Sequence, residues 1–188
     1  MIYYFIEWKE VLSMENIDNY SPNNIMLLMN TIEYGWIDKK NNKHLKIDDS
    51  FCDNYMLQSP KEIIENKLGV CWDQVELERH YFKNNKLNIK TYFLVYYDND
   101  KCPTHTFLTY EENNKFYWFE HSWEKYRGIH EYNTLTDLFT DIKNKFIIDE
   151  LNRSYINSNL IIYEYQKPLS HIGTTDFYSH CENGIRIS

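Results

Sequence analysis

Cys71, His105 and Glu120 are three side chains whose types and order could perform nucleophilic catalysis. Cys71 closely follows Gly69 in the segment LGVCWDQVELERHYF, at the predicted start of an amphipathic helix. The free N–H groups of a first helical turn and the positive end of the helix dipole favour the thiolate form of a cysteine. A thiolate that attacks a carbonyl still needs a proton donor for the leaving group, and the imidazole of His105 could be that donor.

The position of Glu120 relative to His105 depends on the register of a predicted β-hairpin. The segments HTFLTYE and FYWFEHSW flank Asn113-Asn114, and two asparagines can adopt the positive φ angles of a two-residue turn. This turn makes His105 and Glu120 diagonal neighbours on one face, so that the carboxylate could orient the imidazole and stabilise its cationic form. His121 would then point to the opposite face. A three-residue loop would shift the register by one residue and could bring His121 beside His105 instead.

The surrounding elements predict an α+β fold in which N-terminal helices pack on an antiparallel sheet. Ser21-Pro22 and Ser59-Pro60 are typical of helix starts, and Glu62 completes a capping box with Ser59. Apolar stripes at helical spacing contain Ile25, Leu28, Met29 and Ile32 before a stop at Gly35, then Trp72, Val75, Arg79 and Phe82, and later Leu135, Leu138, Phe139, Ile142 and Phe146. The stripe after Cys71 is narrow, and the outer face of that helix is charged. Strands are predicted for residues 88–98, for both arms of the hairpin and for NLIIYEYQ, whereas DKKNNKHLKIDDS is typical of a surface loop and the tail after residue 168 is left unassigned.

The composition is typical of a globular protein. The chain has 188 residues, of which 43% are hydrophobic and 17% aromatic, which is enough for a single domain over residues 1–188 with a sizeable core. A net charge of −8 argues against binding to nucleic acid or to an anionic membrane, since both need clustered Lys and Arg. No apolar run approaches the ~20 residues of a membrane span, and the start MIYYFIEWKE lacks the basic region of a signal peptide. We therefore expect a cytoplasmic protein, and the sequence leaves its oligomeric state open.

The cysteines show no pattern of disulfides or metal ligands. They are Cys52, Cys71, Cys102 and Cys181, and none forms a CxxC pair. We therefore expect reduced thiols. A zinc-stabilised interaction protein is an alternative, in which His171, His180 and Cys181 would bind the metal together with Cys102. Because this spacing matches no known ligand pattern, we expect neither a metal nor an organic cofactor.

The sequence resembles the transglutaminase-like cysteine-hydrolase superfamily, a branch of the papain-like fold. The resemblance lies in GVCWDQVEL followed by THTFLTYEENNKFYWFEHSW, and it covers residues 59 to about 123. It implies a G-x-C sequence at a helix start, a strand, a histidine at the start of a second strand and a carboxylate at the end of a third. The Cys, His and Asp positions of the family carry over to Cys71, His105 and Glu120. Two departures are Glu120 in place of the usual Asp, and Thr106-Phe107 where the family commonly has His-Ala-Trp.

The chemistry that this triad supports is acyl transfer at an amide bond of a peptide or protein substrate. Cys71 would attack the carbonyl, His105 would protonate the departing amine, and Glu120 would orient His105. Resolution of the thioester by water defines a cysteine protease, amidase or deamidase, and resolution by an amine defines a transglutaminase. We favour hydrolysis because no second substrate lobe is evident. The alternative function is a catalytically inactive transglutaminase-like domain that binds a peptide or protein partner.

Residues next to the triad have expected supporting roles. The backbone N–H of Cys71 and the side-chain amide of Gln58 are candidate oxyanion donors. Asp73 and Glu76 lie near the helix start, where acidic residues are favourable, and we interpret both as structural. Trp72 is expected to cover the core or to form a wall of the cleft. The cluster of His121, Trp123, Tyr126 and His130 either lines a substrate groove or packs in the core.

Overall fold

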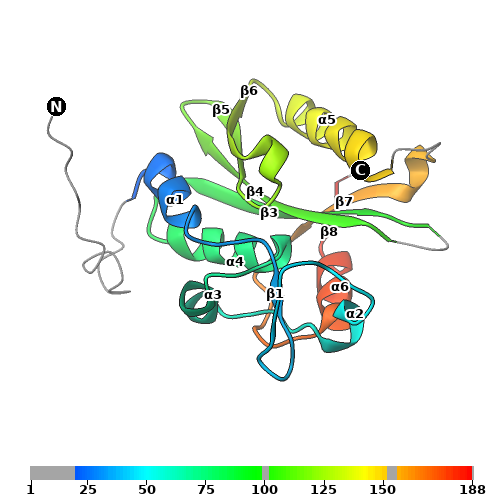
Figure 1. The fold of residues 1–188 in the computed structure, drawn as a ribbon. Coiled ribbons are helices and arrows are strands. Elements are labelled where there is room, and N and C mark those ends of the chain that lie inside the picture. Colours follow the sequence, from blue (N-terminus) through cyan, green and yellow to red (C-terminus); the bar gives the residue numbers. More distant parts are fainter. Residues whose placement is uncertain (1–19, 99–101, 152–155, 188) are drawn as a thin grey trace, which may run out of the picture.

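A six-stranded antiparallel sheet forms the centre of the molecule (Figure 1). The computed structural model describes residues 20–98, 102–151 and 156–187, so the expectation about the first ten residues lies outside the described part. The strands are β3 (Asn88–Tyr96), β4 (Thr104–Glu112), β5 (Lys115–Glu120), β6 (Gly128–Tyr132), β7 (Leu160–Tyr165) and β8 (Ile185–Arg186). Their order is β6-β5-β4-β3-β7-β8, and each neighbouring pair is antiparallel. The predicted α+β class with an antiparallel sheet is confirmed.

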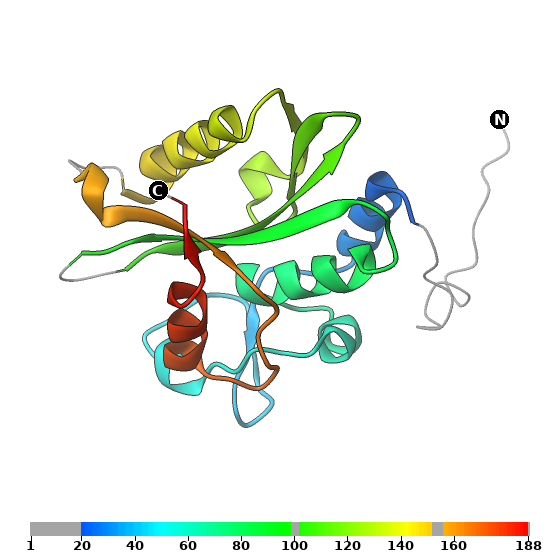
Figure 2. The same cartoon turned by 180° about the vertical axis from the view of Figure 1, so that it is seen from behind.

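Helices cover both faces of this sheet (Figures 1 and 2). They are α1 (Pro22–Met29), α2 (Phe51–Asn54), α3 (Pro60–Asn66), α4 (Cys71–Phe82), α5 (Leu135–Phe146) and α6 (Thr174–Glu182), with short irregular helices at Glu124–Tyr126, Ile147–Leu151 and Asn157–Asn159. Helix α5 buries Leu138, Ile142 and Phe146 against one face, whereas α1, α4 and α6 pack against the other. Within the described ranges, no helix has both the length and the apolar character that a membrane span requires.

The predicted helix starts are confirmed by their hydrogen bonds. The Ser21 side chain accepts from the backbone N–H of Asn24, and Ser59 and Glu62 form the reciprocal capping box. Helix α1 is shorter than predicted, because it ends at Met29 and not near Gly35. The chain beyond it leaves the helical path to form a parallel β-bridge between Glu33 and Leu68, although Ile32 is still buried as its apolar spacing suggested.

The prediction of an exposed, charged outer face on α4 is wrong. Asp73, Glu76 and Glu78 are all buried, because α4 packs against β3 and β4 of the sheet and also against the N-terminal helices α1 and α3. Glu76 accepts from the Arg79 guanidinium at 2.9 Å and from the Tyr165 hydroxyl at 3.2 Å. Buried carboxylates are tolerated only when they are paired or neutral, and each acid of α4 meets one of these conditions in a different way.

Two segments contain more regular structure than the sequence pattern predicted. The expected surface loop of residues 38–50 contributes a strand to the small antiparallel pair β1 (Trp36–Ile37) and β2 (Lys43–His44). The unassigned tail forms α6 and β8, and α6 buries Phe177 and Cys181 in the core beneath the sheet. Both segments contribute walls to the site described next.

Candidate active site

Cys71 is the first residue of α4, as predicted, and it is 6% exposed. The backbone at Gly69 lies close to the Asp73 side chain, since a Cβ on Gly69 would be 2.8 Å from the Cβ of Asp73. The Asp73 carboxylate accepts from the backbone N–H of Val70 at 3.1 Å and caps the helix. The Gln74 side-chain amide donates to the Gly69 carbonyl at 2.7 Å. These contacts fix the backbone on both sides of the thiol.

The predicted hairpin register is confirmed. Asn113 and Asn114 have φ angles of 52° and 61°, and Glu112 pairs with Lys115 across a two-residue turn. The three-residue alternative is thereby excluded. As a result, the His105 Nε2 atom lies 2.7 Å from a carboxylate oxygen of Glu120.

The Glu120 carboxylate is buried and held by four donors. One oxygen accepts from the backbone N–H of Trp123 at 2.7 Å and from the Ser122 hydroxyl at 3.0 Å. The other accepts from the Trp118 indole at 3.2 Å and faces His105. Burial would raise the pKa of Glu120, but the charge of His105 and these hydrogen bonds lower it below the usual value. The carboxylate is therefore ionised and fixed in orientation.

His105 connects Glu120 to Cys71. Its Nε2 atom contacts Glu120, and the Cys71 side chain is close enough to the ring for a hydrogen bond that raises the pKa of His105. Burial would lower the pKa of His105, but the Glu120 charge and the hydrogen bonds with Cys71 and Glu120 raise it to about 10. The imidazole is thus cationic near neutral pH and can give a proton to a group bound beside the sulfur.

The thiol and the imidazole open into a pocket of about 820 Å³. It is lined by Asn30, Ile32, Glu33, Tyr34, Ile47, Phe51, Cys52, Cys71, Trp72, Cys102, Pro103, Thr104, His105, Ser122, Trp123, Glu124, Arg127, Phe146, Glu150, Thr174 and Tyr178. Trp72 forms a wall of the pocket, which was one of the two roles expected for it. It stacks on Phe177 with ring centroids 4.5 Å apart. Trp123 also lines the pocket, with its ring 4.9 Å from His105, whereas Tyr126 and His130 pack behind it. The volume admits a peptide segment or a side chain above the sulfur.

Tyr34 is a pocket residue that sequence reasoning missed. It lines the pocket and is 41% exposed. Desolvation and the negative charges of Cys71 and Glu150 raise the pKa of Tyr34, so its hydroxyl stays protonated. No local pattern marks this residue, because it lies in an irregular segment that only the bridge to Leu68 brings to the site.

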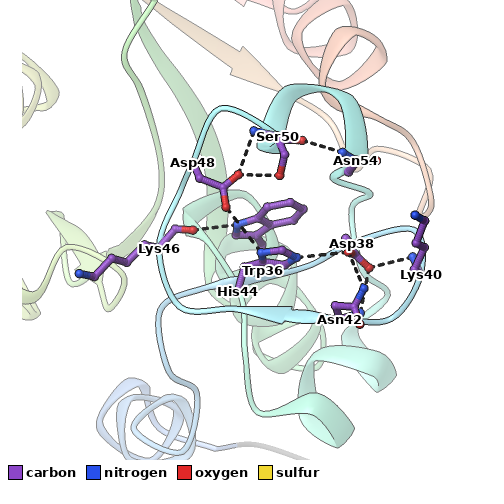
Figure 3. Close-up of polar contacts among 9 residues, drawn as sticks. All are labelled: Trp36, Asp38, Lys40, Asn42, His44, Lys46, Asp48, Ser50 and Asn54. Carbon is purple, nitrogen blue, oxygen red and sulfur yellow. Dashed lines mark hydrogen bonds and ion pairs between the residues drawn. The ribbon is translucent and has the colours of Figure 1, made fainter.

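The loop between β1 and β2 is held by its own polar contacts (Figure 3). The Asp38 carboxylate accepts from the Asn42 side chain at 2.9 Å, from the backbone N–H groups of Lys40 and Asn42, both at 2.8 Å, and from the His44 ring at 3.2 Å. The hydrogen bonds of Asn42, together with those of His44 and Lys40, lower the pKa of Asp38. The His44 ring stacks on buried Trp36 with centroids 4.0 Å apart. The loop itself does not line the pocket, but Ile47, which follows β2, does.

His121 ties the helix of the nucleophile to the strand of Glu120. Its Nδ1 atom lies 2.6 Å from the side-chain oxygen of Gln74, whose amide nitrogen is already donating to Gly69, so His121 Nδ1 carries the proton. Burial and the nearby Arg127 charge lower the pKa of His121 to about 4, which keeps it neutral. The prediction that His121 points away from His105 is correct, and the residue braces the site from the other face of the sheet.

The expectation about Gln58 is corrected, and the one about Asp73 is refined. The Gln58 side chain does not face the pocket: its amide donates to the Leu68 carbonyl at 3.0 Å and its oxygen accepts from Asn66 at 2.8 Å, because it supports the turn between α3 and α4. Asp73 is structural, as expected, but it is fully buried, and burial raises its pKa to about 7 against the effect of its hydrogen bonds.

The alternative zinc ligands do not meet in one place. The His171 ring lies 2.9 Å from Glu62, His180 donates to the Gln166 carbonyl at 2.7 Å, and Cys181 is buried in the core. In the part of the chain that the structure describes, no three His, Cys, Asp or Glu side chains are arranged to hold a metal ion. The structure therefore gives no support to the zinc alternative.

Comparison with known proteins adds no relative. No model of a protein family matches the chain, and no curated protein matches it either. Cys71, His105 and Glu120, together with the pocket above them, are therefore the features of this chain that bear on its function.

Proposed function

We propose that the protein is a cysteine-dependent acyl-transfer enzyme that acts on amide bonds through Cys71, His105 and Glu120. The observation that supports this proposal most strongly is the continuous contact from the thiol to the imidazole and on to the buried carboxylate, at the base of an open pocket. A structural cysteine needs neither an ion-paired histidine nor an opening to solvent. The same contacts give each member of the trio a separate chemical role.

In the proposed reaction, the Cys71 thiolate attacks the amide carbonyl carbon and forms a tetrahedral oxyanion. The backbone N–H of Cys71 has no acceptor within the helix and is the proposed donor to this oxyanion, and Tyr34, which lines the same pocket, is a candidate second donor. His105 then gives its proton to the departing amine, and the thioester remains. Water, activated by the now neutral imidazole, resolves the thioester, while Glu120 holds the ring in one orientation throughout.

We also propose that the architecture is a transglutaminase-like core of the papain-like type, in the cytoplasm where thiols stay reduced. Support comes from the order of a helix that begins at the cysteine, a histidine at the start of β4 and a carboxylate at the end of β5. The replacement of the usual Asp by Glu120 does not prevent contact, since the longer side chain still reaches within 2.7 Å of the ring. Thr106-Phe107 differ from the common family motif, but neither residue is needed for the contacts of the trio.

Thiol labelling tests the proposed nucleophile. At about pH 6 an unperturbed exposed thiol is mostly protonated and reacts slowly with iodoacetamide. We expect Cys71 to be alkylated faster than the exposed Cys52 and Cys102, and His105→Ala to remove this advantage. Equal rates at the three thiols would contradict the proposal and would favour a non-catalytic binding domain.

The reaction type is tested with a mixture of unstructured peptides and mass spectrometry. New peptide termini would identify a peptidase, conversion of a side-chain amide to an acid would identify a deamidase, and incorporation of an added primary amine would identify a transglutaminase. Cys71→Ala must abolish each product, and Cys181→Ala, a change at a buried cysteine outside the pocket, must not. Products that form equally well in wild type and in Cys71→Ala would overturn the assignment.

A further inference from the structure

Three of the four cysteines of the chain lie around one pocket. Cys71 is at its base, and Cys52 and Cys102, both exposed, are in its walls. Cys181 is fully buried in the core and does not line the pocket. In a chain with so few cysteines, this grouping puts two accessible thiols next to the proposed nucleophile.

A single tyrosine marks how closely the three thiols are grouped. Tyr178 of α6 lines the same pocket, and its hydroxyl donates to the Cys102 carbonyl at 2.9 Å. Burial raises the pKa of Tyr178 against the effect of a hydrogen bond with Thr104, and the nearby Cys102, Cys52 and Cys71 raise it further. Tyr178 and the three cysteines thus line the same pocket.

A hydrogen bond links the segment of Cys102 to the helix of Cys71. The residue after Cys71, Trp72, donates from its indole to the Thr104 hydroxyl at 3.3 Å, and Thr104 is two residues beyond Cys102. A disulfide needs Cα atoms about 4.4–6.8 Å apart. Cys102 precedes β4 and lies outside the sheet. Its thiol donates to the Asp98 carbonyl at 3.7 Å and its carbonyl accepts from Tyr178, so these contacts must break for the Cys102 sulfur to reach Cys71.

We propose that Cys71 is a site of reversible thiol oxidation, at which a hydroperoxide forms a sulfenic acid that Cys102 captures as an intramolecular disulfide. This inference rests on the proposed function only in requiring a reactive Cys71 beside His105. It adds a second class of substrate, the hydroperoxide, to the same sulfur. The disulfide blocks attack on amides and at the same time protects Cys71 from irreversible oxidation.

The chemistry balances in two steps. In the first, the Cys71 thiolate attacks one peroxide oxygen, the O–O bond breaks, and the departing hydroxide takes a proton from the His105 imidazolium to leave as water. The sulfur loses two electrons to the peroxide and becomes a sulfenic acid. In the second step, the Cys102 thiol attacks that sulfur, the S–O bond breaks, and the hydroxide leaves as water with the thiol proton. In total, two thiols and one peroxide give one disulfide and two waters.

Peptide mapping after treatment with hydrogen peroxide tests the proposal, because trypsin separates all four cysteines. Cleavage after Lys and Arg puts Cys71 in residues 68–79, Cys102 in 102–115, Cys52 in 47–61 and Cys181 in 154–186. In the wild-type chain we expect a crosslink between 68–79 and 102–115, loss of Cys71 alkylation, and recovery of alkylation with dithiothreitol. In Cys102→Ser we expect Cys71 to proceed to sulfinic acid, with at least about tenfold less recovery, since thiols do not reduce that product.

Matched variants make the outcome decisive. Cys52→Ser removes an exposed thiol of the same pocket and should still form the crosslink to Cys102. A crosslink of Cys71 to Cys52, crosslinks only between separate chains, or equal recovery in wild type and Cys102→Ser would each overturn the proposal. The crosslink is read by mass and not by activity, so it can form even if no amide substrate exists. Amide hydrolysis at Cys71 without the crosslink would leave the proposed function intact and reject this inference.

Discussion

Replacing Glu120 by Gln is the substitution that tests the site most directly, because it keeps the shape of the side chain and removes its charge. At the observed 2.7 Å, the attraction between the carboxylate and the imidazolium is roughly 6 kcal/mol for an effective dielectric constant of about 20. Desolvation of both groups opposes this attraction, and a charge-assisted hydrogen bond is worth about 1.5–3 kcal/mol net. The imidazolium form of His105 should therefore become about 10-fold to 200-fold less populated relative to neutral imidazole.

The hydrogen bonds of Glu120 add a second effect. Its two oxygens accept from Trp123, Ser122, Trp118 and His105, whereas a Gln amide offers only one oxygen. If that oxygen stays with the Trp123 N–H, the new NH₂ group faces His105 and requires its Nε2 to accept. The ring proton then moves to Nδ1 and the imidazole is neutral, so the thiolate loses its cationic partner.

The assay is the rate of Cys71 alkylation by iodoacetamide as a function of pH, measured on the tryptic peptide of residues 68–79. We expect Glu120→Gln to lower this rate below neutral pH, because the Gln amide requires Nε2 to accept and the imidazolium is lost, and the two rates should converge as the pH rises and thiols ionise without help. Glu124→Gln makes the same change of charge on an exposed residue of the same pocket and should react as wild type does. Equal rates for wild type and Glu120→Gln would refute the role of Glu120.

The ion pair of His105 and Glu120 should also make the free energy of unfolding depend on pH. The pKa of His105 is raised from 6.5 to about 10, so its contribution is complete below about pH 6.5 and is lost as the pH rises toward 10. The pKa of Glu120 is lowered from 4.5, so its contribution is complete above about pH 4.5 and is lost as the pH falls below that value. The difference in free energy of unfolding between wild type and Glu120→Gln should therefore be largest between about pH 4.5 and 6.5, as measured by urea unfolding.

Three further predictions concern the structure that positions the site, and urea unfolding measures each of them. Burial raises the pKa of Glu78, so above about pH 4.5 the side chain must take up a proton when the protein folds. Glu78→Gln removes this requirement and should stabilise the protein increasingly as the pH rises above about 4.5, by up to about 1.4 kcal/mol per pH unit. The exposed Glu65→Gln is the control, and a stability difference independent of pH would contradict this prediction. Gln74→Leu should cost about 1–3 kcal/mol, since it leaves the buried His121 N–H and a backbone carbonyl without partners, and an unchanged midpoint would show that this brace is dispensable. Asn114→Val should cost about 1–2 kcal/mol because a β-branched residue is strained at a φ of 61°, whereas Asn114→Gly should be tolerated, and equal stability of the two variants would argue against the two-residue turn.

The parts of the site that depend on local chemistry could be predicted from the sequence. The φ preference of two asparagines fixes the hairpin turn, and the two-residue period of a strand then fixes which side chains share a face with His105. The capping box and the glycine before Cys71 likewise act over a few residues. Each of these rules operates within one turn or one hairpin, which is why the contact between His105 and Glu120 followed from the sequence.

The parts that depend on distant partners could not be predicted. Glu76 looks like a surface acid in its own helix, and only Tyr165, far along the chain, shows why it can be buried. Gln58 precedes a helix in a way that suggests a free amide, but its partners Leu68 and Asn66 come from the end of that helix and the turn that follows it. Tyr34 reaches the pocket through a single β-bridge. Tertiary packing decides such positions, and no periodicity in the sequence encodes them.

The pocket is built from segments on both sides of β7 in the sequence. Cys71, His105 and Glu120 all precede β7, but Thr174 and Tyr178, which close one side of the pocket, come after it on α6. Since a chain is synthesised from its N-terminus, a nascent polypeptide that already contains the trio still lacks this wall of the pocket. The pocket is therefore complete only after α6 has been synthesised and has packed beneath the sheet.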